Sequence, residues 1–178
     1  MDETRARTSD EMLVTGLFND RPSAERAYDS VTARGYDKND VNLVMSDDTR
    51  KRHFTGAGTE TELGNKAAKG AGVGGAIGGT VGAIAAVVAA VGTIAIPGIG
   101  IVVAGPLAAA LAGGGAGAAT GGLIGALVGA GIPEERVKDY EAGIKKGGIL
   151  MGVKARNAAD AEYFKQDWQT NQGEHIYS

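Results

Sequence analysis

The chain has 178 residues, contains no cysteine and carries a formal net charge of −3. This length suits one ordinary domain, or a small domain with an insertion, and the lack of cysteine excludes disulfides, thiolate metal sites and a cysteine nucleophile. The acidic balance argues against a general nucleic-acid-binding protein. Glycine is the unusual residue, because it fills 30 positions, more than twice its usual share of about 7%.

The N-terminal segment, residues 1–11, is a polar tail. A secretory signal peptide has a basic start followed by an apolar core, and Met1 to Glu11 has neither. Together with the absence of cysteine, this predicts a protein of the cytoplasm, or one associated with the inner membrane from the cytoplasmic side.

The first ordered elements predict a β-α-β unit. The apolar run from Met12 to Phe18 is typical of a buried strand, and Val41 to Met45 predicts a second one. Between them, Pro22 suits a first helical turn, and Gly35 suits the left-handed residue that ends a helix. Four residues at helical spacing predict the buried face of this helix: Ala24, Ala27, Tyr28 and Val31.

The C-terminal part predicts an α-β-α unit. A helix is expected to begin at Pro133, where the helix dipole favours Glu134 and Glu135 in the first turn. Its buried face is Val137, Tyr140 and Ile144, and it ends at Gly147 or Gly148. A strand follows over Ile149 to Val153, and a last helix from about Ala158 buries Ala161, Phe164 and Trp168.

Together these elements predict an α/β (α+β) fold, in which a small ferredoxin-like β-α-β…α-β-α domain is split by a long insertion. The domain is expected over 12–65 and 133–178, and the insertion over 66–132. The first unit implies a crossover between parallel strands. Arg52 to Gly56 is a candidate for an extra short strand.

Beyond Lys69, the insertion contains no charged residue. From Gly70 to Pro133, 64 residues contain no ionisable side chain and no aromatic ring. Proline and glycine in the connector from Ala95 to Gly105 divide this run into two halves, each longer than the roughly 20 residues of a membrane span. The sequence therefore predicts two Gly/Ala-rich helices joined by a tight apolar turn.

Glycines recur every fourth residue in both halves, and such a row forms a straight ridge along a helix. Glycine costs a helix about 0.8–1.0 kcal/mol relative to alanine, so the rows predict close helix packing, as in small-xxx-small contacts. A flexible linker is disfavoured, since it would contain Ser and charges and would lack this period. The expected packing or oligomerisation residues are Gly70, Gly74, Gly78, Gly82, Gly113, Gly117, Gly121, Gly125 and Gly129, and Gly105 extends the second row upstream.

Two functions are compatible with this insertion. A transmembrane helical hairpin would mediate membrane association, with the α/β domain in the cytoplasm. Alternatively, a soluble homo-oligomer would bury its hairpins in a shared apolar core, which the missing Trp and Tyr belts favour. The expected partners are therefore the chain itself and membrane lipid, with no nucleic acid, small-molecule substrate or cofactor.

A basic cluster before the insertion is a candidate site for lipid headgroups, because basic residues next to an apolar segment attract anionic lipids. The alternative is a solvated loop diluted by Glu60 and Glu62, and the sequence leaves both open. The candidate residues are Arg50, Lys51, Arg52, Lys66 and Lys69, with His53 beside them.

No arrangement in the sequence predicts catalysis or metal binding. The segment from Gly70 to Gly75 matches the G-x-G-x-x-G pattern of dinucleotide-binding sites. However, no predicted strand precedes it, and no acidic residue follows about 20 positions later. The acidic pair Asp47–Asp48 is expected at a strand end and the pair Glu134–Glu135 in a helix first turn, so both are expected to serve structure and not a cation site. His53 and His175, expected in a loop and a tail, lack ligand spacing. We therefore expect a protein that is not an enzyme.

Six segments of the chain form a recognisable set: Val14–Asp20, Ala24–Tyr28, Gly35–Tyr36, Asp40–Val44, Ile96–Leu111 and Gly131–Glu141. Together they resemble bacterial general stress proteins with the heat-induced stress protein domain. The resemblance covers about residues 11–156, and it implies a stress-associated bacterial protein without established enzymatic chemistry. It supplies no catalytic residues.

Overall fold

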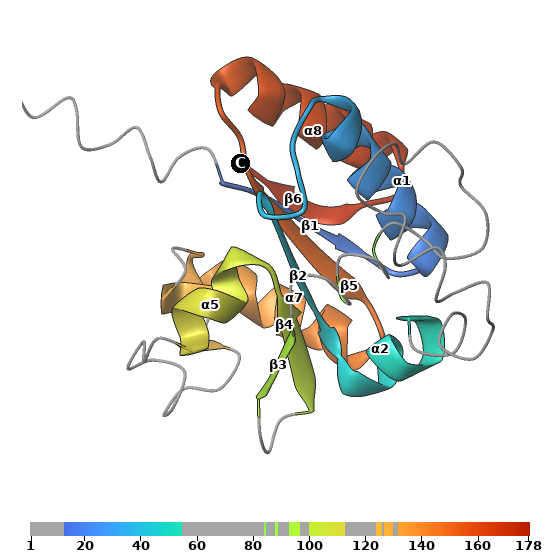
Figure 1. Cartoon of the computed structure of the whole chain (residues 1–178), viewed down its shortest axis with the longest axis vertical. Coiled ribbons are helices and arrows are strands. Elements are labelled where there is room, and N and C mark those ends of the chain that lie inside the picture. The colour runs from blue at the N-terminus through green and yellow to red at the C-terminus, as the bar shows by residue number, and fades with distance from the viewer. Residues whose placement is uncertain are drawn as a thin grey trace, which may run out of the picture.

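The computed structural model describes residues 13–54, 84, 88, 93–96, 100–112, 124–125, 127–129 and 132–178 (Figure 1). The expected tail over residues 1–11 lies outside this part of the chain. The elements are, in order, β1 (Leu13–Phe18), α1 (Arg21–Ala33), β2 (Val41–Ser46), α2 (Asp47–Phe54), β3 (Thr93–Ile96), β4 (Ile101–Ala104), α5 (Pro106–Ala112), α7 (Glu134–Lys145), β5 (Ile149–Lys154), α8 (Ala158–Thr170) and β6 (Glu174–Tyr177).

The strands form one antiparallel sheet with the order β3-β4-β2-β5-β1-β6. Both β1 and β2 pair with β5, which lies between them, so β1 and β2 run parallel to each other. Likewise, β5 and β6 run parallel on either side of β1. The expected mixture of helices and strands is confirmed, and two β-α-β units interleave in it.

Local signals set the helix ends as expected. The carboxylate of Asp20 caps α1 by accepting a hydrogen bond from the Ser23 amide at 2.8 Å, and Pro22 lies in the first turn. Gly35, just beyond the helix, has φ +78°. Asn157 caps α8 in the same way through the Asp160 amide. These short-range contacts satisfy amide groups that a helix start leaves unpaired.

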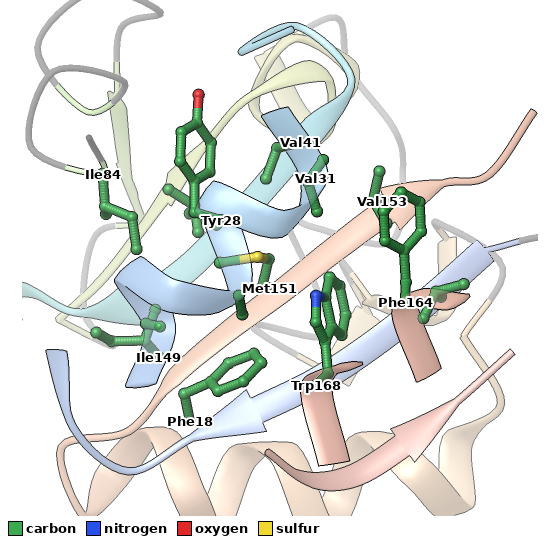
Figure 2. Packing of buried hydrophobic residues seen from close by; sticks show 14 of the residues in the cluster. Phe18, Tyr28, Val31, Val41, Ile84, Ile149, Met151, Val153, Phe164 and Trp168 are labelled. Atoms are coloured by element: carbon green, nitrogen blue, oxygen red, sulfur yellow. The ribbon is translucent and has the colours of Figure 1, made fainter. Parts of the chain in front are cut away.

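Helices α1 and α8 cover one face of the sheet and α7 covers the other (Figure 1). On the first face, the Phe18 and Trp168 rings pack edge to face, 5.6 Å between centroids (Figure 2). On the second, Val137, Tyr140 and Ile144 are buried, as the sequence predicts. The sheet therefore has an apolar core on each side.

The expected strand over Arg52 to Gly56 is wrong, because its described residues, up to Phe54, lie in helix α2. The Ser46 hydroxyl accepts a hydrogen bond from the Thr49 amide at 3.0 Å and so caps this helix. Acidic residues occupy its first turn and basic residues its last turn, which is the distribution the helix dipole favours. His53 accordingly lies in a helix and not in a loop.

The connector of the insertion is also not the expected tight turn between helices. Thr93–Ile96 and Ile101–Ala104 form a β-hairpin, and β4 extends the sheet by pairing with β2 from Leu43 to Ser46. The β-branched residues of this segment suit a strand, and the free edge of β2 gives it a partner. At the opposite edge, β6 contains His175, which the sequence had placed in a tail.

Candidate functional site

The structure describes only part of the predicted packing surface. Of the glycine rows, Gly125 and Gly129 lie in its helical residues 124–125 and 127–129. The other seven predicted packing glycines, together with Lys66, Lys69 and the Gly70 to Gly75 motif, lie outside the described residues. Gly125 is half-buried, whereas Gly129 is exposed. A methyl group built on Gly129 would meet no atom within 4 Å, so the described part of this chain places no helix against it.

Gly105 serves strand packing and not a helix ridge. It lies between β4 and α5 with φ +96°, a left-handed conformation that residues with side chains rarely adopt. A methyl group at this position would overlap the Val41 carbonyl oxygen of β2. The neighbouring Asn42 side chain then accepts a hydrogen bond from the Leu107 amide at 2.7 Å and holds the start of α5. The local sequence gives no signal for Asn42 in this role.

The described residues of the insertion pack onto both faces of the α/β domain. Ile84 is fully buried in the core under α1, close to Tyr28 in Figure 2, and its amide donates to the Glu25 carboxylate at 3.1 Å. Leu127 is fully buried on the opposite face, in the core that α7 covers. The insertion therefore contributes to the core of the domain instead of forming a wholly separate unit.

The basic cluster predicted before the insertion lies on α2. Asp47 pairs with Arg50 at 2.8 Å and with Lys51 at 2.6 Å. These hydrogen bonds lower the pKa of the Asp47 carboxyl group, and the one from Lys51 contributes most. Arg52 is exposed and donates to the Asp48 carbonyl at 3.3 Å. Sequence analysis had placed these basic residues in a loop or a strand, whereas the structure places them in a helix.

A partly buried ionic contact joins the loop after α1 to the start of α8. The Asp160 carboxylate accepts hydrogen bonds from the Tyr36 hydroxyl and from the Arg34 guanidinium, each at 2.7 Å. These two donors, Tyr36 first, lower the pKa of the Asp160 carboxyl group. Burial raises the pKa of the Tyr36 hydroxyl. The sequence did not predict this contact, because its partners lie far apart along the chain.

The two acidic pairs singled out in the sequence both lie at helix starts. Glu134 and Glu135 lie in the first turn of α7, as expected. Asp47 and Asp48, expected at a strand end, directly follow β2 but lie in the first turn of α2, a helix that the sequence did not predict. Within the ranges that the structure describes, no three His, Cys, Asp or Glu residues gather to hold a metal ion. In the same ranges, no helix combines the length and apolarity needed to cross a membrane.

The comparisons with known proteins found no matching family model, no similar curated protein and no similar solved structure.

Proposed function

We propose that this chain is a non-enzymatic bacterial stress protein whose glycine-rich insertion mediates membrane association, self-assembly or both. The observation that carries the proposal is the run from Gly70 to Pro133, in which 64 residues contain no ionisable side chain. Apolar surface of this extent needs lipid or protein to cover it. The stress role rests on the sequence resemblance alone.

A ferredoxin-like arrangement is proposed for the domain that presents the insertion. Four strands in the order β2-β5-β1-β6, with α1 and α8 on one face, support it. The hairpin β3–β4 extends this arrangement beyond β2. In such a sandwich the insertion leaves the domain after α2 and returns to it before α7.

The connector of the insertion limits how the protein would meet a membrane. Because β4 pairs with β2, the arms over 55–92 and 113–131 each begin and end on the same folded domain. A single transmembrane span would carry the two ends of an arm to opposite sides of a bilayer. The proposal therefore favours association at the membrane surface over a simple spanning hairpin.

The second candidate is a soluble homo-oligomer, and the exposed helical residues of the insertion favour it. Val128 is 42% exposed, although it is a large apolar residue, and its neighbour Gly129 faces open space. A second copy that packed against this side would cover both residues. Glycine would then allow a close approach of the two backbones.

Fractionation and light scattering test the two candidates. Membrane association predicts that the protein stays in carbonate-washed membranes, whereas recovery only as a discrete particle without detergent would contradict it. The oligomer predicts a mass above that of an 18.0 kDa monomer, and a monomer would exclude it. Substitution Gly121→Leu should weaken either assembly, while the control Leu123→Ile should change it little.

A further inference from the structure

Helix α2 packs against the turn that follows α7. The Thr49 hydroxyl donates a hydrogen bond to the Gly147 carbonyl at 3.2 Å, which joins α2 to the turn between α7 and β5. A methyl group built on Gly147 would lie 3.8 Å from a terminal nitrogen of Arg52. Figure 1 accordingly shows α2 and the beginning of β5 at one end of the sheet. Lys145 and Lys146 directly precede Gly147 in the chain, so the backbone at the end of α7 leads into the turn that contacts Arg52.

We call this group the cationic face and define it as Arg50, Lys51, Arg52, Lys145 and Lys146. Lys145 pairs with Glu141 at 2.7 Å, and Asp47 pairs with two residues of α2. The acidic residues at this face are Asp47, Asp48 and Glu141. Five positive charges therefore stand against three negative charges, which leaves a net charge of +2 in a chain whose net charge is −3. Within the described part of the chain, no carboxylate forms an ion pair with Arg52 or Lys146.

The cationic face adjoins the charge-free connector of the insertion. The Asp47 amide, at the start of α2, donates a hydrogen bond to the Gly100 carbonyl at 2.7 Å. Gly100 and Ala95 are exposed, and the connector from Ala95 to Gly105 contains no charged residue. The helix that contains the basic residues, α2, and the uncharged connector are therefore neighbours at one end of the molecule.

We propose that the cationic face binds the anionic headgroups of a phospholipid surface. Basic residues beside an apolar segment are the usual combination for binding at such an interface. A single-stranded nucleic acid would stack successive bases on several exposed rings, but of the two rings of α2 only that of His53 is exposed, because Phe54 packs against the core. The inference rests on the proposed membrane association and names the lipid class and the residues.

Vesicle sedimentation with the full-length chain tests the inference. One set of vesicles contains phosphatidylcholine alone, and the other contains phosphatidylcholine and phosphatidylglycerol in equal parts. The test variant is Arg52→Ala/Lys146→Ala. The matched control, Lys38→Ala/Lys154→Ala, removes two positive charges at the opposite end of β2 and β5.

We expect wild-type protein and the control to bind the anionic vesicles and the test variant to bind about 30-fold more weakly, since each basic residue near an anionic surface contributes about 1 kcal/mol. Equal losses in both variants would overturn the inference, as would tighter binding to single-stranded DNA than to the vesicles. Equal binding of wild-type protein to both kinds of vesicle would overturn it while leaving insertion-driven membrane association intact. Binding to neither kind would contradict membrane association itself.

Discussion

The hydroxyl groups of Thr15 and Tyr140 lie 2.7 Å apart in the protein interior and join β1 to α7. The Tyr140 hydroxyl also donates to the His175 carbonyl of β6 at 2.9 Å. One buried phenol therefore links a central strand, the edge strand and the helix that covers them. Burial raises the pKa of this phenol to about 12.

Substitution Tyr140→Phe should lower the free energy of unfolding by about 1–3 kcal/mol, because it leaves buried polar groups without partners. Chemical denaturation at neutral pH would measure the change. The control is Tyr177→Phe, since the half-buried Tyr177 ring packs beside Tyr140 at 6.3 Å and its hydroxyl has no hydrogen-bond partner among the described residues. A loss as large for Tyr177→Phe would contradict the role given to the Tyr140 hydroxyl.

The raised pKa of Tyr140 predicts a loss of stability in alkali. The folded state keeps this phenol protonated up to a pKa of about 12, whereas an ordinary phenol has a pKa of 10.0. Between these values the unfolded chain releases a proton that the folded chain retains, so stability falls as the pH rises through this window. Denaturation at a series of pH values would show the slope, which should be smaller in Tyr140→Phe.

The contact of Asp160 with Tyr36 and Arg34 predicts a loss of stability in acid. Its pKa lies below the ordinary value of 3.8, so its stabilisation is complete above that value and disappears as the pH falls through the lowered pKa. Substitution Asp160→Asn should remove this part of the acid dependence. The control Asp139→Asn, at an exposed site, should keep it. An identical acid profile for wild-type protein and Asp160→Asn would contradict the assignment.

The burial of Leu127 predicts that the insertion stabilises the α/β domain. Substitution Leu127→Ala should lower the free energy of unfolding by about 2–5 kcal/mol, the usual cost of a cavity in a core. The adjacent control, Val128→Ala, alters a residue that is 42% exposed and should change stability by less than about 0.5 kcal/mol. If both variants unfolded like the wild-type protein, the insertion would be an independent unit.

Sequence reasoning succeeded where a structural signal is local. The spacing of Ala24, Ala27, Tyr28 and Val31 identified one buried helix face, and that of Val137, Tyr140 and Ile144 identified another, because one short segment contains the whole pattern. The left-handed conformation of Gly35 could be predicted in the same way, because a glycine directly after a helix commonly ends it. The mixed α/β class could therefore be predicted from the sequence.

The contributions of the insertion to the fold were missed, because they depend on distant partners. The Gly- and Ala-rich composition suggested helices throughout, but the free edge of β2 gives Ile101 to Ala104 a strand to pair with. Similarly, no local pattern shows that Asp160 meets Tyr36, 124 positions away. At the candidate site, the sequence identified Arg52 but not the neighbouring end of α7, which only the folded chain brings close.

Gly129 offers a direct test of packing between copies. Among the described residues, no atom lies within 4 Å of a methyl group built on this helical residue, so Gly129→Gln should raise the stability of the dilute protein by about 0.5–1 kcal/mol through better helix propensity. In an assembly that packs a second copy against the same side, the added side chain should overpack the contact and cost about 1–3 kcal/mol. We predict that the variant dissociates at higher protein concentration than the wild type, as measured by light scattering over a dilution series. Substitution Gly129→Ala serves as the control, because alanine improves helix propensity but remains small enough for close packing. An assembly of Gly129→Gln as stable as that of Gly129→Ala would remove Gly129 from the contact between copies.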